Sequence, residues 1–465
     1  MRALRLGLLL VVSLVSGPSL GQGMVLPEVH SVELENGVVI ILHEKRDVPL
    51  VGLQAVIRGG AVTDPAGKAG MSSLLAGMLE KGAGSRDAAT FAEAIDSVGG
   101  SLTASAGLES ITISGEFLAR DAELMIELLV DMLQAPALKP AEINKLRDRR
   151  VNLIRAAKDG DPRPLTSVYG NAFLFGDHPY GTPVEGNEES LAKISHRELL
   201  AYYEDYVGAD RLIISLVGDI DAGETINKLT AAFADWRHAA KPLPEIAAPV
   251  AQVGRRVLLV DKPGATQTYF WIGNVGVDIT YAQRAELDIA NTLFGGRFTS
   301  LLVDELRTRA GLTYGVRSVL LRPTQAGSFA IVSYTKTGTT IAAIDLSLEL
   351  LARLREEGFD EALVSSGKNY ILGQFPPRLE TAMQLAGQFA TLEAHGLDAS
   401  FIDDYGAAIA AAAGETIQSV IADVYPHPDN LVFVILGDAG LIRDAVAKYG
   451  PISEMAITAA RFRPE

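Results

Sequence analysis

The feature that most constrains the fold of this chain is a long-range internal repeat. The apolar run V-L-L-V-D-K, which ends at Lys262, repeats the pattern of Val39–Lys45, and N-L-V-F-V-I-L-G-D repeats R-L-I-I-S-L-V-G-D. Three residue pairs keep nearly the same separation, which is 217 for Lys45 and Lys262, 219 for Glu142 and Glu361, and 219 for Gly218 and Gly437. Such close agreement across the chain indicates a tandem duplication rather than a short-period solenoid.

Each copy mixes short strands with runs of helix. In the first copy, Asn36-Gly37 is typical of a hairpin turn before a β-branched strand, and residues 212–217 form a fully apolar strand. Apolar residues at helical spacing predict helices at 71–79 and 87–98, and a longer one that starts at Asp121. The pattern therefore predicts an α+β fold of two similar halves, each a mainly antiparallel sheet covered by helices on one face.

Two segments set the expected domain boundaries. Arg2 and Arg5 precede an apolar run and then small residues, which is typical of a secretory signal peptide over residues 1–22, with an uncleaved membrane anchor as the alternative. The stretch K-P-L-P-E-I-A-A-P contains three prolines and predicts a linker over 241–253. The two halves are then 23–240 and 254–465, and we expect no membrane segment once the signal is removed.

Composition excludes several classes of function. A formal net charge of −16 argues against binding to nucleic acid or to an anionic membrane surface. The absence of cysteine excludes disulfides, thiolate metal sites and cysteine nucleophiles. No G-x-S-x-G motif supports a serine nucleophile at Ser72 or Ser73. The seven histidines are all more than ten positions apart, so no helix face offers two imidazoles to a metal: His30, His43, His178, His196, His238, His395 and His427.

Four motifs carry a resemblance to a known family. They are L-E-N-G-V-V-I at 34–40, G-M-S-S-L-L-A-G-M-L-E-K-G at 70–82, H-P-Y-G at 178–181, and G-G-R-F-T-S-L-L-V-D-E-L-R-T-R-A-G-L-T-Y at 295–314. In this order, on two homologous halves, they resemble the insulinase/pitrilysin-like zinc peptidases, or inverted zincins. The chain looks most similar to the short bacterial branch that is like the mitochondrial processing peptidases. With the signal peptide, this resemblance implies export to a bacterial periplasm.

The resemblance also implies that this chain lacks the family's zinc site. Active members carry H-x-x-E-H in the first half, where two histidines bind zinc and the glutamate is the general base. The matching positions here are Ser73 and Gly77 for the histidines and Ala76 for the base. The third ligand is a glutamate on a later helix, and the matching frame places Arg155 near that position. The degenerate motif therefore implies no metal and no other cofactor in this chain.

The second half keeps a pair of residues that the resemblance assigns to substrate contact. Arg307 and Tyr314 match the arginine and tyrosine that family members place near the scissile bond, and Gly311 between them suits a left-handed helix end. A guanidinium and a phenol can both donate hydrogen bonds to a developing oxyanion or to the peptide backbone. The alternative is an ordinary surface arginine beside a half-buried tyrosine.

These observations lead to a hypothesis with two alternatives. The chain is expected to be the non-catalytic subunit of a heteromeric zinc metallopeptidase. A homologous partner with H-x-x-E-H would bring the zinc, and this chain would close the peptide chamber and supply Arg307 and Tyr314. One alternative is a purely structural subunit, like the family's core proteins in respiratory complexes. The other is a peptide-binding protein that works alone as a homodimer.

Overall fold

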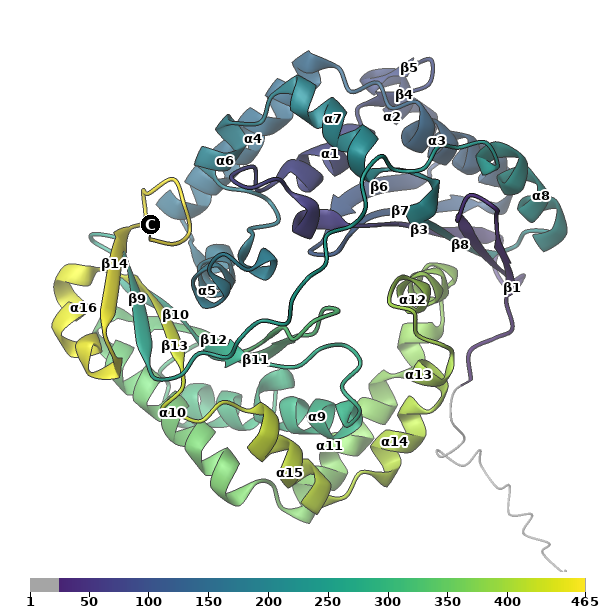
Figure 1. The fold of residues 1–465 in the computed structure, drawn as a ribbon. Coiled ribbons are helices and arrows are strands. Elements are labelled where there is room, and N and C mark those ends of the chain that lie inside the picture. The colour runs from purple at the N-terminus through teal and green to yellow at the C-terminus, as the bar shows by residue number, and fades with distance from the viewer. Residues whose placement is uncertain (1–24, 465) are drawn as a thin grey trace, which may run out of the picture.

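Each half of the molecule is built on a six-stranded sheet, and the two sheets face each other (Figure 1). The structure is a computed structural model that describes residues 25–464, so the predicted signal peptide lies outside the described residues. In spatial order the first sheet consists of β1 (His30–Glu33), β2 (Val39–Glu44), β8 (Leu212–Gly218), β3 (Leu50–Arg58), β7 (Ser110–Leu118) and β6 (Ser101–Ala106). Only β2 and β8 pair in parallel in this sheet.

Five strands of the second sheet repeat the order of five strands of the first. From the corresponding edge the second sheet consists of β14 (Ile452–Ala456), β9 (Arg256–Asp261), β13 (Val432–Gly437), β10 (Gln267–Val275), β12 (Ser328–Lys336) and β11 (Val316–Leu321). Its sixth strand, β14, follows the others in sequence, whereas β1 precedes the others in the first sheet. The strands β9 and β10 start 217 positions after β2 and β3, at residues 256 and 267 against 39 and 50. The predicted duplication and the mainly antiparallel α+β fold are thus confirmed, although β14 adds a second parallel pair, with β9.

Most helices lie on the outer sides of the two sheets (Figure 1). In the first half they are α1 (Met71–Leu79), α2 (Ala88–Asp96), α3 (Ala122–Gln134), α4 (Pro140–Asp159), α6 (Glu188–Ala192), α7 (His196–Tyr206) and α8 (Ala222–Phe233). In the second half they are α9 (Arg284–Asn291), α10 (Thr340–Glu357), α11 (Glu361–Gln374), α13 (Ser400–Asp403), α14 (Tyr405–Ala411), α15 (Gly414–Val424) and α16 (Ala439–Val446).

The two remaining long helices are exchanged between the halves. Helix α12 (Ala382–Ala394) belongs to the second half but packs on β3 and β8 of the first sheet. Helix α5 (Thr166–Phe175) belongs to the first half but packs on β10 and β13 of the second sheet. The expectation that helices cover one face of each sheet was therefore incomplete. All residues of β8 and β13 are buried, so the inner face of each sheet also needs an apolar cover.

Two glycines allow the exchanged helices to approach the sheets closely. A Cβ atom on Gly170 of α5 would lie 2.6 Å from ring atoms of Trp271 on β10. A Cβ atom on Gly52 of β3 would lie 2.6 Å from the backbone nitrogen of Met383 on α12. Both distances are shorter than real side-chain contacts. Each helix can approach its sheet this closely only because glycine has no side chain.

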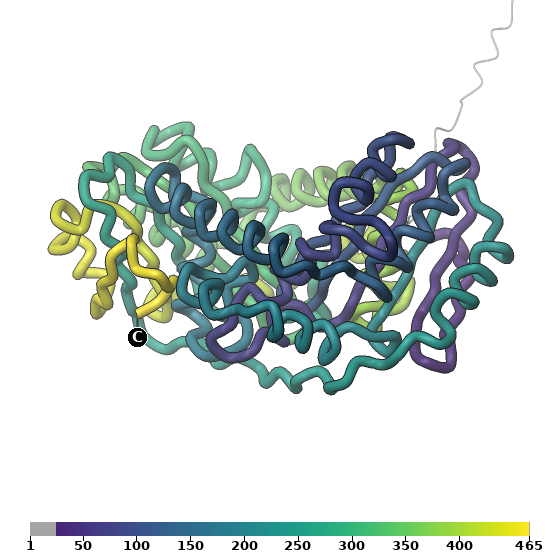
Figure 2. Tube along the Cα trace, turned by 90° about the horizontal axis from the view of Figure 1, so that it is seen from above, coloured from purple at the N-terminus to yellow at the C-terminus, as the bar shows by residue number. Residues whose placement is uncertain are grey.

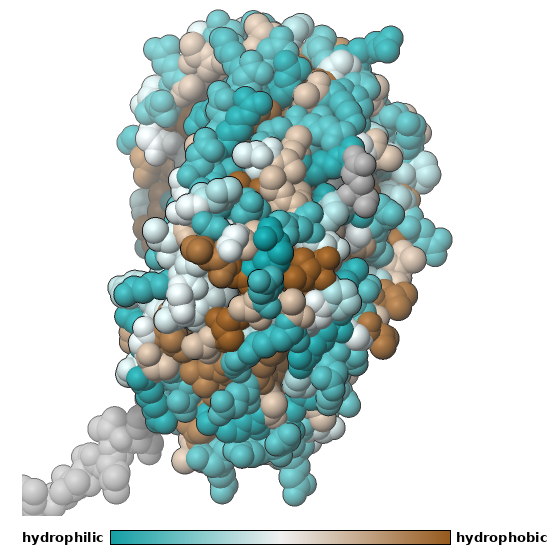
Figure 3. Space-filling model, turned by 90° about the vertical axis from the view of Figure 1, so that its left-hand side faces the viewer, coloured by the Kyte–Doolittle hydropathy of each residue, from teal (hydrophilic) through white to brown (hydrophobic). Residues whose placement is uncertain are grey.

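The linker and the C-terminal segment also join the halves. No helix or strand occurs between α8 and β9 in the described chain, and this stretch, which contains the predicted linker, runs along one side of the molecule (Figure 2). Phe462 returns to the first half, where its ring meets Tyr169 edge to face at 5.0 Å. There Lys158 donates to the carbonyl oxygen of Ala459 at 2.7 Å and pairs with Glu188 at 2.7 Å. Figure 3 views the side of the molecule on which the C-terminal segment lies. Apolar side chains gather at mid-height on this face, among hydrophilic ones.

A search of the described residues finds no single helix that is both long and apolar enough to cross a membrane. The segments Ser400–Ala411 and Gly414–Val424 meet that criterion only when joined, and they are bent by 113° relative to each other.

Replacing Gly52 with alanine should destabilise the folded chain. The added methyl group would meet the backbone of α12, which cannot rotate away, and overpacking of this kind costs about 1–3 kcal/mol. Urea unfolding measures the loss. Gly387→Ala is the matched control on α12, because a Cβ atom there meets nothing within 4 Å and alanine favours a helix. Equal midpoints for the two variants would contradict the close packing.

Candidate functional site

Helix α1 carries the degenerate metal motif and begins at a carboxylate cap. Asp64 accepts hydrogen bonds from the backbone N–H groups of Gly70 at 2.7 Å and Ser72 at 2.8 Å. Desolvation of this carboxyl group raises the pKa of Asp64 to about 7, although the N–H donors act in the opposite direction. The cap fixes the start of α1. Ser73 and Ala76, further along this helix, are both buried.

An arginine occupies the space in front of the motif. The guanidinium of Arg150, on α4, donates through Nη2 to the carbonyl oxygen of Ser73 at 2.7 Å and through Nη1 to the Ser73 hydroxyl. A Cβ atom on Gly77 would lie 3.2 Å from Nη2 and 2.8 Å from Cδ2 of Leu146. Arg150 forms an ion pair of 2.6 Å with Glu185. The side chain is only 14% exposed, and burial lowers the pKa of Arg150, yet arginine remains charged in proteins.

The structure places Arg150, rather than Arg155, against helix α1. Arg155 is exposed, and the residue of α4 that faces α1 is Arg150, five positions earlier. Five residues turn a helix by about 140°, so the two side chains lie on different faces. The buried residues Ile143 and Ile154 share the face of Arg150, at separations of seven and four. This periodicity shows which face of α4 is turned inward, and Arg155 lies outside that face.

The residues present do not fit zinc. Ser73 offers a hydroxyl that already accepts a hydrogen bond, Ala76 and Gly77 offer no ligand atom, and a guanidinium cation cannot coordinate a metal. No group of three His, Cys, Asp or Glu side chains in the described part of the chain is arranged to hold a metal ion.

The structure brings Arg307 and Tyr314 together and adds a third residue. The guanidinium carbon of Arg307 lies 4.6 Å from the ring centroid of Tyr314 and 4.7 Å from that of Phe298. Both rings are largely exposed, at 75% and 72%, so the half-buried tyrosine of the alternative interpretation is not what the structure shows. Phe298 was missed because an isolated phenylalanine in a loop carries no sequence signal. We call these three residues the aromatic–arginine cluster.

Local backbone geometry holds the aromatic–arginine cluster in place. Arg307 lies in a π-helix at Val303–Arg309, where an ordinary helix was expected, and its apolar neighbours Val303 and Leu306 are buried. Gly311 has φ of 61°, the left-handed conformation expected at this helix end. The neighbouring Arg309 pairs with Asp304 at 3.0 Å, whereas the contacts described for Arg307 are with the two rings.

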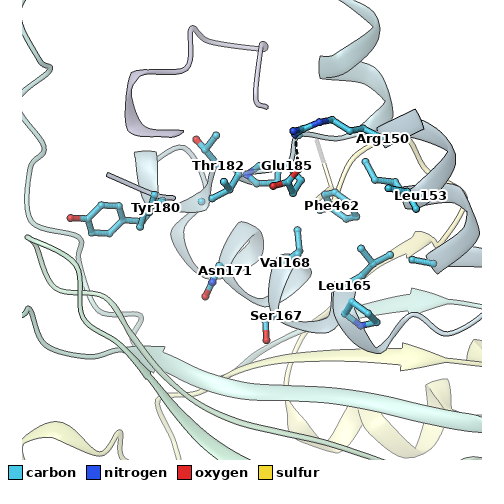
Figure 4. Close-up of a pocket in the computed structure, with 18 of the residues that line it drawn as sticks. Arg150, Leu153, Leu165, Ser167, Val168, Asn171, Tyr180, Thr182, Glu185 and Phe462 are labelled. Carbon is cyan, nitrogen blue, oxygen red and sulfur yellow. Dashed lines mark hydrogen bonds and ion pairs between the residues drawn. The ribbon is translucent and has the colours of Figure 1, made fainter. Parts of the chain in front are cut away.

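A cavity of about 570 Å³ lies beside the degenerate motif. Figure 4 shows Arg150 and Glu185 at one end of the cavity, with helix α5 forming the opposite wall. Most of its lining is apolar, including Leu153, Leu165 and Phe462. Polar groups are few, and they come mainly from Ser167, Asn171, Tyr180 and Thr182.

Family models match both halves of the chain. Residues 38–183 match the model described as insulinase, peptidase family M16, and residues 193–371 match the peptidase M16 inactive domain. The chain belongs to the M16 peptidase family. The family predicted from the motifs is therefore confirmed, and the residues at its metal-motif positions mark this chain as an inactive-type M16 member.

Known M16-like proteins resemble the chain over most of its length. An uncharacterized zinc protease of Mycobacterium leprae is 27% identical over 68% of this chain and 71% of its own length. One from Streptomyces coelicolor is 24% identical over 81% of this chain and 84% of its own length. The crystal structure of a peptidase M16 inactive domain from Pseudomonas fluorescens superposes with a TM-score of 0.81 at 20% identity, covering 88% of this chain and 98% of that one. These likenesses agree with the two-half fold.

Zinc binding should be restored only when the third ligand is placed at position 150. The variant Ser73→His, Gly77→His, Arg150→Glu provides two imidazoles and a carboxylate on facing helices and removes the cation. We expect about one zinc per chain by elemental analysis after dialysis. The same histidine pair with Arg155→Glu should bind none, because that side chain points away and Arg150 remains. Zinc in the second variant alone would show that position 155, and not position 150, faces the histidine pair.

Stability should depend on pH through Asp64. Its pKa is about 7 in the folded chain and about 4 when unfolded, so between these values the folded state holds a proton that the unfolded state has released. The contribution of Asp64 to the free energy of unfolding is therefore full below about pH 4 and is lost as the pH rises to 7. Urea midpoints at pH 5 and pH 7.5 should fall more for the wild type than for Asp64→Asn. A wild type that gains stability relative to this variant would contradict the raised pKa.

Proposed function

We propose that this chain is the non-catalytic subunit of a heteromeric zinc metallopeptidase, in which an M16 partner with H-x-x-E-H brings the metal. This chain closes the peptide chamber and supplies Arg307 and Tyr314 to the partner's site for hydrolysis of the peptide bond. The chain is exported to the periplasm and carries no cofactor of its own.

The observation that carries the proposal is the contrast between the two halves. In the first half, each metal-motif position holds a residue that cannot serve zinc, and Arg150 fills the space in front of them. In the second half, the aromatic–arginine cluster holds a half-buried arginine beside an exposed phenol. A chain that cannot cleave alone thus presents the donor groups that cleavage needs.

The chemistry of peptide hydrolysis gives these donors a role. When bound in the partner, zinc polarises the scissile carbonyl and activates water. The developing oxyanion is stabilised by preorganised donors, and both the Tyr314 hydroxyl and the Arg307 guanidinium can donate. The Arg307 guanidinium contacts the rings of both Phe298 and Tyr314, and these contacts restrict its rotamers. Less ordering of the Arg307 side chain is therefore needed when substrate binds.

Removing either donor should lower turnover of the complex without disrupting it. Loss of one oxyanion donor typically costs about 10²–10³ in kcat, and we expect this range for Arg307→Ala and for Tyr314→Phe. The measurement is cleavage of an unstructured fluorogenic peptide by this chain mixed with its H-x-x-E-H partner, compared with each chain alone. Arg309→Ala is the matched control, since that exposed arginine pairs with Asp304 and Glu305 instead.

The alternatives give different results in the same experiment. A purely structural subunit would form the complex, and neither Arg307→Ala nor Tyr314→Phe would change its turnover. A peptide-binding protein that works alone would bind peptide without any partner and would not raise the partner's activity. The cavity beside α1 supports peptide binding by the lone chain, and this property is compatible with the proposed heteromer.

A further inference from the structure

Arg150 places a cation beside the degenerate metal motif of α1. Two hydrogen bonds to Ser73 fix the Arg150 side chain, so its guanidinium stays at one end of the cavity. Its side chain is 14% exposed. A charge withdrawn from water to this degree needs a compensating anion.

The only carboxylate described in an ion pair with Arg150 is weakly held. Glu185 lies in the loop before α6, and its side chain is 64% exposed. Ion pairs with one solvent-exposed partner contribute little, because water competes for the carboxylate and the side chain must be ordered. Glu185 can therefore leave when another carboxylate reaches Arg150, and its position marks where that carboxylate would lie.

The cavity next to Arg150 is suited to an apolar group. Leu153, Ile154, Leu165, Val168 and Phe462 form its walls (Figure 4), and about 570 Å³ is enough for a large side chain and part of a backbone. The hydroxyl groups of Ser167 and Thr182 and the amide of Asn171 line the same space. A ligand that fits all these features joins a carboxylate, an amide and an apolar side chain.

We infer that this cavity binds the C-terminal residue of a peptide, with Arg150 holding the free α-carboxylate and the apolar walls holding the last side chain. A fatty acid shares the carboxylate and the apolar group, but it has no backbone amide to bond with the hydroxyls of Ser167 and Thr182, as a peptide has. The Asn171 amide oxygen already accepts from the Ser328 hydroxyl at 3.3 Å. The inference rests on the proposed function, because it names the peptide end that this subunit holds.

Binding of labelled peptides to the lone full chain tests the inference. The probe is an unstructured hexapeptide that ends in leucine, with a fluorophore at its N-terminus, and anisotropy reports its Kd. We expect the free acid to bind at least about tenfold more tightly than the C-terminal amide, because the amide carries no charge for Arg150. Glu185→Gln should tighten binding of the acid several-fold by removing the competing carboxylate. Arg150→Ala should abolish the preference for the acid.

The controls separate the site from general charge effects. Arg155→Ala removes a charge from the same helix on an exposed face and should keep the preference for the acid. A hexapeptide ending in aspartate carries more negative charge but should bind less well than the leucine peptide. Circular dichroism of each variant checks that it is folded.

Several results would overturn the inference. Equal affinity for acid and amide, or an unchanged preference in Arg150→Ala, would exclude carboxylate binding at Arg150. Decanoate that binds while the peptide acid does not would show that the occupant is a fatty acid. These outcomes do not depend on the partner, so the inference can fail while mixing with the partner still restores peptidase activity through Arg307 and Tyr314, and the reverse also holds.

Discussion

The exchange of α5 and α12 is the packing arrangement on which the rest of the structure depends. The central strands β8 and β13 are buried along their whole length, and each sheet is packed against a helix from the other half. Ile213 and Val217 of β8 pack with Leu385 and Phe389 of α12 in one apolar cluster. Separating the halves would expose these clusters, and burial of apolar surface at about 25 cal/mol per Å² makes such exposure costly. The duplicated halves are therefore one folding unit rather than two independent domains.

The exchange also determines where chemistry can occur. Helix α5 packs on the second sheet and also lines the cavity, through Ser167, Val168 and Asn171. Helix α4 of the first half and Phe462 of the second close the same cavity. Tyr180 adds a link between the halves, since its hydroxyl donates to Glu109 at 2.6 Å and accepts from the N–H of Gln325 at 2.8 Å. The cavity is thus made of both copies, and its shape is fixed by their interface.

Sequence reasoning found the features that repeat or that form motifs. The nearly equal separations of three residue pairs, one of them Lys45 and Lys262, were enough to predict the duplication, because register between copies survives when most side chains have changed. It missed the exchange because a fully apolar strand such as β8 shows that both faces are buried but not which helix covers them. It did not single out Arg150 because the frame was counted from a motif that had lost its ligands. The spacing of Ile143 and Ile154 shows that Arg150 lies on the inward face of α4 and Arg155 does not.

Arg150 places a guanidinium beside the degenerate metal motif, and a guanidinium differs chemically from a metal ion although both are cations. A divalent ion polarises a carbonyl and lowers the pKa of bound water, because it accepts lone pairs. A guanidinium has no vacant coordination position, remains protonated, and only donates hydrogen bonds, which favours carboxylates over carbonyls. Cleavage creates a new carboxylate, so in the proposed heteromer one subunit makes the chemical group that the other can hold. A subunit without catalytic chemistry of its own would then still attract the charged ends of substrate peptides. This attraction gives a physical reason for the largely buried Arg150 beside the degenerate motif.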